Sequence, residues 1–339
     1  MLPAPLPDRS EVPRRAAGAR RLALVVAAGV LGGLLVGLGP RPRVEGRWVE
    51  PAVPAEPDAW LSGRESGVSD LEPDEAKAIV WADSATRGRT PVALAYLHGF
   101  SADRHEVEPL VADVARDLGA NVYYARLTGH ALDGEALAQA TADDWLADAA
   151  EAVAVAASIG ERLVLIGTST GGSLALWAAT RPEAAGRVAA LVLVSPNLGL
   201  RDRRAEMLLW PWGGLLARLI EGPERCFTPR TEAEARHWTT CYPTRALLPM
   251  MALVDLARAL EPTDLRVPTL VLYSERDEIV DPAATVRFFA QVDGAAVRTR
   301  VVNDSGDPAH HVLAGDIMSP ATTARVRDEI LRFLDATLR

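Results

Sequence analysis

The sequence predicts an α/β protein with a mostly parallel β-sheet covered by helices on both faces. From about residue 76, short apolar runs alternate with helix-like runs, which is typical of a sheet built from strand–helix units. The short runs are apolar at successive positions, as in strands that are buried on both faces. We expect strands at Ala78–Trp81, Val92–Leu97, Asn121–Tyr124, Leu163–Ile166, Ala190–Val194, Thr269–Tyr273 and Val297–Val302.

Helices are expected between most of these strands. The clearest is Ala142–Ser158, because Thr141 precedes it and Asp144 follows three residues later, an aspartate version of the capping box. The other helices are expected at Val107–Leu118, Gly172–Thr180, Pro282–Gln291 and Thr322–Leu338.

Residues 197–267 interrupt this alternation. They show no clear strand but several short helical pieces, and an insertion of this length between two sheet strands is typical of a functional cap. Two interpretations of its apolar side chains stay open: they line an acyl pocket, or they pack on the cap's own core. These side chains are Leu208, Leu209, Trp210, Trp212, Leu215 and Leu216.

The two cysteines of the chain, Cys226 and Cys241, both lie in this insertion. In an oxidising compartment, their spacing allows one disulfide that closes a short loop, and two free thiols are the alternative. Two cysteines without a nearby histidine pair are a poor zinc site, so no metal is expected there.

The charge of the chain is unevenly distributed. Residues 1–47 hold eight arginines against three acidic residues, a net charge of +5, whereas the other 292 residues carry −14. An acidic body gives no electrostatic reason to bind nucleic acid. Only one of the 36 basic residues is a lysine, Lys77, which indicates a GC-rich and bacterial coding bias.

Residues 22–39 are uncharged and, as a helix, would span about 27 Å, enough to cross a bilayer core. The arginines before them favour a cytoplasmic N-terminus. We therefore expect a basic cytoplasmic tail at 1–21, a transmembrane signal anchor at 22–39, a linker at 40–75 and the folded domain at 76–339. A cleaved signal peptide is the alternative, although its cleavage site would be poor. Both interpretations place the domain outside the cytoplasm, in the periplasm or the extracellular space.

The motif Gly167-Thr-Ser-Thr-Gly171 carries the most information about function. It follows an expected strand and precedes an expected helix, the setting in which G-x-S-x-G forms a sharp turn. The two glycines allow the tight turn, and the serine oxygen is held exposed near the positive end of the helix dipole. Ser169 is therefore the expected nucleophile, and an ordinary glycine-serine turn is the alternative.

A serine nucleophile needs an adjacent base, which a carboxylate orients. Behind such a turn these groups follow in the order serine, acid, histidine, each after a strand. Asp277 comes just after the sixth expected strand, and only His310 and His311 follow the seventh. We expect His311 to be the base, since the apolar Val312 and Leu313 would anchor its loop; His310 is the alternative. The remaining acids of the first loop are expected to be solvated charges or a helix cap: Glu275, Glu278 and Asp281.

The reaction of such a serine passes through an oxyanion, which needs two backbone N–H donors. We expect one from Thr170, directly after the nucleophile. The other is expected from Phe100, in the loop that follows the second strand, where Gly99 lets the chain turn. His98 precedes the nucleophile in the sequence and is expected to form structural hydrogen bonds.

Together these motifs resemble those of the α/β-hydrolase superfamily over about residues 76–339. The turn Arg126-Leu-Thr-Gly-His130 is similar to the one found in monoacylglycerol-lipase-like and lysophospholipase-like hydrolases of the serine aminopeptidase S33 group. The other motifs that carry the resemblance are Leu97-His-Gly-Phe100, Gly167-Thr-Ser-Thr-Gly171, Tyr273-Ser-Glu-Arg-Asp277 and His311-Val-Leu313.

The resemblance implies an α/β-hydrolase fold with a helical cap, a Ser169–His311–Asp277 triad, and oxyanion donors at Phe100 and Thr170. A serine nucleophile makes acyl transfer the natural chemistry, so we expect hydrolysis of small-molecule carboxylic esters, with acylglycerols and lysophospholipids as candidate lipids. The alternatives are an acyltransferase or peptidase with the same triad, or a non-catalytic binding protein. No metal or organic cofactor is expected, because the triad supplies the nucleophile and the base itself.

Overall fold

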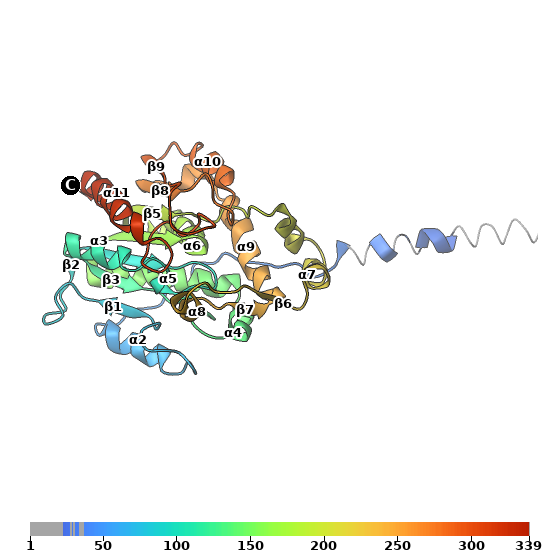
Figure 1. Cartoon of the computed structure of the whole chain (residues 1–339), viewed down its shortest axis with the longest axis horizontal. Helices are drawn as coiled ribbons and strands as arrows, with labels where there is room; N and C mark the ends of the chain where they lie inside the picture. Colours follow the sequence, from blue (N-terminus) through green and yellow to red (C-terminus); the bar gives the residue numbers. More distant parts are fainter. Residues whose placement is uncertain (1–22, 28, 30, 34–36, 339) are drawn as a thin grey trace, which may run out of the picture.

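The computed structural model describes residues 23–27, 29, 31–33 and 37–338 (Figure 1). Its centre is a seven-stranded sheet with the strand order β1-β3-β2-β4-β5-β8-β9. All neighbours in this sheet pair in parallel except β1 and β3, which are antiparallel. The strands are β1 (Ala78–Val80), β2 (Thr90–Leu97), β3 (Asn121–Tyr124), β4 (Gly160–Thr168), β5 (Val188–Val194), β8 (Thr269–Tyr273) and β9 (Val297–Val301). Each overlaps a strand that the apolar runs predicted.

Helices cover both faces of the sheet, as predicted. On one face α3 (Leu110–Leu118) and α11 (Pro320–Leu338) bury Val114, Ile330 and Phe333 against β2, β4 and β5. On the other face lie α5 (Ala142–Ile159), α6 (Thr170–Ala179) and α9 (Leu247–Arg258). Outside the cap there are also several short helices, with η marking a 3-10 helix. They are η1 (Arg104–Glu106), α4 (Gly134–Gln139), η2 (Pro182–Ala184), η5 (Pro262–Asp264) and α10 (Pro282–Phe289).

The helix boundaries follow local chemistry. Thr141 and Asp144 form the expected capping box, each side chain bonded to the other's backbone N–H. Helix α3 begins at Leu110 rather than Val107, because Pro109 disfavours a helical conformation of Glu108.

The insertion between β5 and β8 contains more than the short helices that we expected. It holds η3 (Arg203–Leu209), α7 (Gly213–Glu221), α8 (Glu232–His237) and η4 (Thr244–Ala246) before α9. It also contains a two-stranded antiparallel sheet of β6 (Glu224–Cys226) and β7 (Cys241–Pro243), which the sequence analysis missed. Three-residue strands are too short to show a periodic pattern, which explains the omission.

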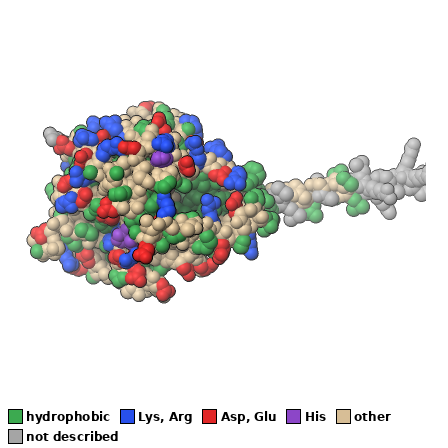
Figure 2. All heavy atoms as spheres, in the orientation of Figure 1, with side chains coloured by type: hydrophobic (Ala, Val, Ile, Leu, Met, Phe, Trp, Pro, Cys, Tyr) green, Lys and Arg blue, Asp and Glu red, His purple; other side chains and the backbone are tan. Residues whose placement is uncertain are grey.

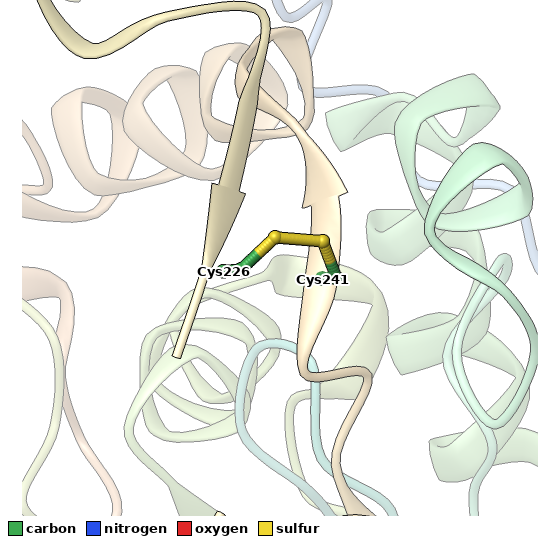
Figure 3. Close-up of a disulfide and its surroundings, with 2 residues drawn as sticks. All are labelled: Cys226 and Cys241. Atoms are coloured by element: carbon green, nitrogen blue, oxygen red, sulfur yellow. A yellow bond between two sulfur atoms is a disulfide. The ribbon is translucent and has the colours of Figure 1, made fainter. Parts of the chain in front are cut away.

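Cys226 and Cys241 are paired residues of this small sheet, and the structure joins them in a disulfide (Figure 3). The open question of a disulfide or two free thiols is therefore answered in favour of the disulfide. The bond closes a loop that contains α8, so it holds the edge of the cap together.

Residues 40–75, which we expected to form a linker, lie against the domain. Helix α2 (Pro57–Glu65) buries Leu61 in the main core, and Trp48 stacks on Trp177 of α6. Glu65 forms a buried, bidentate ion pair with Arg126 in the loop after β3. Nε and Nη2 of Arg126 lie 2.7 and 2.8 Å from the two carboxylate oxygens. The sequence showed no apolar period here because only isolated side chains of this segment reach the core.

The predicted transmembrane anchor at 22–39 falls partly outside the described residues, and the predicted tail at 1–21 falls wholly outside them. Residues 23–27 are helical. Over the part of the chain that the structure describes, none of the helices combines the length and the apolar character needed to cross a membrane.

Candidate active site

The expected nucleophile, Ser169, lies at the junction of β4 and α6. Its backbone has φ 52° and ψ −115°, a conformation that is strained for any residue with a side chain. The carbonyl of Val194 in β5 holds this turn by accepting a hydrogen bond from the Ser169 N–H at 2.9 Å. The side chain therefore projects from the carboxyl end of the sheet at the start of a helix, as the G-x-S-x-G motif predicted.

The two glycines of the motif are required by close backbone contacts. A Cβ atom on Gly167 would lie 2.3 Å from the carbonyl oxygen of Gly171. A Cβ atom on Gly171 would lie 2.0 Å from the carbonyl oxygen of Leu97 in β2. Larger residues at either position would thus push α6 away from the sheet and move Ser169.

Asp277 and His311 meet at the same end of the sheet, although 34 positions separate them. Asp277 follows β8 and His311 follows β9, and the Nδ1 atom of His311 lies 2.8 Å from Oδ2 of Asp277. The other oxygen of Asp277 accepts hydrogen bonds from the N–H groups of Ile279 and Val280. His311, held through Nδ1 by this carboxylate, lines the same cavity as Ser169.

The neighbouring His310 has a different environment. Its backbone is left-handed, with φ 52°, and its Nδ1 lies 3.5 Å from the hydroxyl of Ser305. The structure thus brings His311 rather than His310 to Asp277. Of the competing acids, Asp281 caps α10 by accepting from the N–H of Ala283, Glu275 accepts from the side-chain amide of Asn303, and Glu278 lines the cavity without bonding to His311.

Two further residues, which the sequence analysis did not identify, position His311. One carboxylate oxygen of Asp307 accepts hydrogen bonds from the N–H groups of His311 and Val312, at 3.0 and 2.9 Å. The hydroxyl of Ser195, at the end of β5, donates to the carbonyl of His311 at 2.7 Å. Burial lowers the pKa of the His311 imidazole, but the charge and hydrogen bond of Asp277 outweigh this and raise the pKa above its usual value.

The expected oxyanion donors, Phe100 and Thr170, flank Ser169 on two segments. Phe100 follows β2, and Thr170 is the first residue of α6. Both residues line the same cavity as Ser169 and His311. Among the described residues, neither backbone N–H donates to a protein acceptor, which leaves both free to bind a substrate oxygen.

A buried carboxylate, Glu106, supports the Phe100 loop from behind. Its Oε1 atom accepts hydrogen bonds from the N–H of Gly99 at 2.7 Å and from the hydroxyl of Tyr96 at 2.6 Å. Burial raises the pKa of Glu106 to about 7, although the Tyr96 and Gly99 hydrogen bonds favour the charged form. The sequence gives no indication of this role, because it arises only when η1 folds back so that Glu106 contacts Gly99 and Tyr96.

His98 is structural, as expected. Its Nε2 atom accepts from the N–H of Leu127 at 3.0 Å, and its Nδ1 atom lies 2.9 Å from the Gly99 carbonyl. Complete burial lowers the pKa of His98 to about 4, so the ring is neutral near pH 7. This bonding fixes the start of the loop that carries Phe100.

A cavity of about 500 Å³ extends from Ser169 beneath the cap. Of the six cap side chains whose role was open, only Leu208 lines this cavity; Trp210, Trp212 and Leu215 are exposed. Figure 2 shows a hollow with hydrophobic side chains on this face of the molecule, close to α7. The other apolar lining residues of the cavity include Leu200, Met207, Ala217, Ile220, Leu247 and Met250.

Comparison with known families agrees with this geometry. Residues 90–306, almost two thirds of the chain, match the family described as serine aminopeptidase, S33. The chain belongs to this family. The match begins at β2 and ends between β9 and His311, so it includes Ser169, Asp277 and the whole cap.

Relatives of this S33 protein include lipases. It is 26% identical over 198 residues to a thermostable monoacylglycerol lipase from Bacillus sp. (strain H-257), covering 57% of this chain and 73% of that protein. Such similarity indicates a carboxylic ester hydrolase, as the motifs predicted.

Solved structures show the same fold. A structure from a study of the metagenome-derived lipolytic enzymes LipS and LipT superposes with a TM-score of 0.63 at 20% identity, covering 79% of this chain and 100% of that one. A soluble variant of monoglyceride lipase from Saccharomyces cerevisiae superposes with a TM-score of 0.56 at 14% identity, covering 77% and 91%. The predicted α/β-hydrolase fold is thereby confirmed.

Proposed function

We propose that this protein hydrolyses carboxylic esters of long acyl chains, with Ser169 as nucleophile, His311 as base and Asp277 as the acid that orients it. The observation that carries the proposal is the 2.8 Å contact between His311 and Asp277, beside the cavity that both His311 and Ser169 line. A histidine held through Nδ1 by a buried carboxylate has its Nε2 atom available to accept the serine proton.

In the proposed reaction, Ser169 Oγ attacks the ester carbonyl while Nε2 of His311 takes its proton. The negative charge that develops on the carbonyl oxygen is stabilised by the N–H groups of Phe100 and Thr170. The imidazolium then gives its proton to the leaving alcohol, and an acyl-serine remains. Water attacks this acyl-enzyme by the same route, with His311 again as base, and releases the acid.

The substrate class follows from the cavity. Its lining is more apolar than polar and includes aliphatic side chains from η3, α7 and α9, which suit an acyl chain, together with charged side chains such as Arg225 and Arg230. The related Bacillus enzyme is a monoacylglycerol lipase, and we propose monoacylglycerols, with lysophospholipids as a second lipid class, for this chain too.

Chain-length preference tests this assignment. Ile220 and Leu219 are both largely exposed, but only Ile220 also lines the cavity, at its rim. Ile220→Trp is expected to lower kcat/KM for palmitoyl esters by about tenfold or more, with little effect on acetyl esters, while Leu219→Trp leaves both unchanged. Fatty-acid release from monoacylglycerols of increasing length measures this. Equal effects of the two variants, or no turnover of any ester, would contradict the proposed substrate class.

The family description also names an aminopeptidase, so amide cleavage is the second candidate function. Ester and amide hydrolysis share the triad, and the two are separated by offering amino-acid p-nitroanilides beside monoacylglycerols. Release of nitroaniline with no ester hydrolysis would favour the peptidase.

We also propose that residues 22–39 anchor the chain in a membrane, with the catalytic domain outside the cytoplasm. The support is the uncharged run of eighteen residues, the arginines before it, and the disulfide in the cap, which is typical of oxidising compartments. Extraction of the full chain from membranes only by detergent, and digestion of the domain by protease added outside spheroplasts, are the expected results.

A further inference from the structure

A second cluster of chemically active side chains lies outside the proposed active site. Asp103 and His105 belong to the loop that continues from Phe100 into η1, and His237 is the last residue of α8 in the cap. One nitrogen or oxygen atom of each side chain lies within 4.8 Å of the others. Glu75, from the segment before β1, lies beside these three residues, with one carboxylate oxygen 3.7 Å from Nδ1 of His237.

Both histidines direct the same ring nitrogen at Asp103. Nδ1 of His105 lies 3.0 Å from one carboxylate oxygen, and Nδ1 of His237 lies 2.8 Å from the other. The two rings are stacked, with centroids 4.2 Å apart. Two imidazole nitrogens and a carboxylate thus converge on one small volume.

The carboxylates of the cluster are buried. The side chain of Asp103 is only 3% exposed and that of Glu75 only 7%. Asp103 is well supplied with hydrogen bonds, but Glu75 has longer contacts: 3.7 Å to His237 and 4.0 Å to Nε of Arg236. The like charges of Glu75 and Asp103 destabilise each other, and a cation beside them would offset that repulsion.

Solvent reaches the cluster through a separate surface pocket of about 390 Å³. Asp103, Glu75 and His237 all line it, and Asp70 adds a further carboxylate to its wall. A hydrated cation can therefore approach Asp103, Glu75 and His237 through this pocket, whose lining has more carboxylates than the one guanidinium of Arg236.

We propose that Asp103, His105 and His237, with Glu75 as the fourth ligand, bind a transition-metal dication of the zinc type. Two imidazoles with carboxylate oxygens are a ligand set suited to Zn²⁺, with bonds of about 2.0–2.2 Å. Tetrahedral ligands at that distance lie about 3.3 Å apart, close to the 3.0 and 2.8 Å that separate the two Nδ1 atoms from the two oxygens of Asp103.

The metal would join three segments that are far apart in the sequence. They are the segment before β1, the loop after β2 and the cap. The cap already contacts this loop, because the N–H of Thr239 donates to the carbonyl of Ser101 at 2.7 Å. Ser101 lines both this pocket and the proposed acyl cavity and follows Phe100 directly. A metal here thus fixes the cap to the loop that carries a proposed oxyanion donor.

Cobalt provides the direct test, since Co²⁺ replaces Zn²⁺ and has visible absorption that reports coordination. The full chain, purified without a histidine tag and treated with EDTA, is titrated with CoCl₂ and then with ZnCl₂. We expect one equivalent of Co²⁺ to bind, visible bands typical of tetrahedral coordination, and their loss when Zn²⁺ displaces it. The temperature of unfolding should rise with ZnCl₂.

Three variants locate the ion. His237→Gln and His105→Gln are expected to weaken Co²⁺ binding by at least about tenfold. His311→Gln, which removes the proposed catalytic imidazole but leaves the cluster intact, is expected to bind Co²⁺ as the native chain does. Circular dichroism checks that each variant folds. His105→Gln is expected to disturb the fold least, because the side chain of His105 is 23% exposed.

The proposal would be overturned by a native chain that binds no stoichiometric Co²⁺, which would leave a hydrogen-bonded His–Asp–His cluster. It would also be overturned by undiminished binding in both His105→Gln and His237→Gln, or by loss of binding in His311→Gln alone.

Discussion

Glu106 accepts a 2.7 Å hydrogen bond from the backbone N–H of Gly99, and so a buried carboxylate supports the loop that presents the Phe100 N–H. The space between them is tight, because a Cβ atom on Gly99 would lie 2.9 Å from Oε2 of Glu106 and 3.4 Å from Cβ of Ser169. Gly99 is therefore packed closely between this carboxylate and the proposed nucleophile.

Glu106 should make stability depend on pH. In the unfolded chain it ionises near its usual value of 4.5, whereas burial holds the folded pKa at about 7. The folded protein binds the extra proton in this window, so Glu106 lowers the free energy of unfolding as the pH rises from 4.5 to 7, by about 3 kcal/mol in total. Glu106→Gln keeps an acceptor for Gly99 and removes the titration. Urea unfolding at pH 4.5 and pH 8 should show the variant gaining relative stability at the higher pH; a pH-independent difference would contradict this.

Asp277→Asn tests the orientation of His311. The variant should lower kcat by about 10⁴-fold, since the amide does not hold the required tautomer or stabilise the imidazolium. In the native protein, activity should rise with pH through the raised pKa of His311, because the base must be neutral. Removing the Asp277 charge lowers that pKa, so the residual activity of the variant should begin at lower pH. A pH profile of kcat/KM measures both effects. If activity rises at the same pH in the variant and the native protein, Asp277 does not interact with His311 as described.

Gly171→Ala should be strongly destabilising, by several kcal/mol, since its Cβ would meet backbone atoms of β2 at 2.0 Å. Gly63→Ala is the matched control, because Gly63 lies in α2 with no atom within 4 Å of an added Cβ. There alanine should be neutral or stabilise by about 1 kcal/mol through helix propensity. Thermal unfolding compares the two variants, and similar unfolding temperatures would show that α6 does not need its close approach to the sheet.

The disulfide should stabilise the cap. Closing a loop of about 15 residues contributes about 3 kcal/mol by restricting the unfolded chain. The double variant Cys226→Ser/Cys241→Ser is therefore expected to unfold at lower urea concentration than the oxidised protein. Reduction of the native chain should give the same shift, whereas reduction of the double variant should change nothing. If the native chain does not respond to reductant, the bond makes no contribution.

The sequence was sufficient for features that arise within one segment. Each apolar run became a strand of the sheet. The strands β2, β4, β5 and β8 are mostly buried, as successive apolar residues indicate, whereas the edge strands β1 and β9 are partly or largely exposed. The turn at Ser169 was visible because its glycines and its serine are adjacent in the chain. Asp277 and His311 were predictable because parallel strands bring their carboxyl ends to one edge, so that loops after different strands meet.

Features that leave no repeating pattern or motif in the sequence were not predictable. Glu106 and Asp307 are ordinary acidic residues in the sequence, and only the folded loops place them beneath Gly99 and His311. The same holds for the cluster of Asp103 and His237, which lie 134 positions apart. Isolated core contacts, such as that of Leu61, likewise leave no periodic signal.

The most direct test of the account is covalent labelling of the full chain by a fluorophosphonate, which reacts with activated serines. Labelling should be rapid and stoichiometric, should map to the peptide that contains Ser169, and should vanish in Ser169→Ala. It should persist in Ser158→Ala, which changes a serine at the end of α5. A folded native chain that is not labelled, or labelling that survives in Ser169→Ala, would contradict the assignment of Ser169 as the nucleophile.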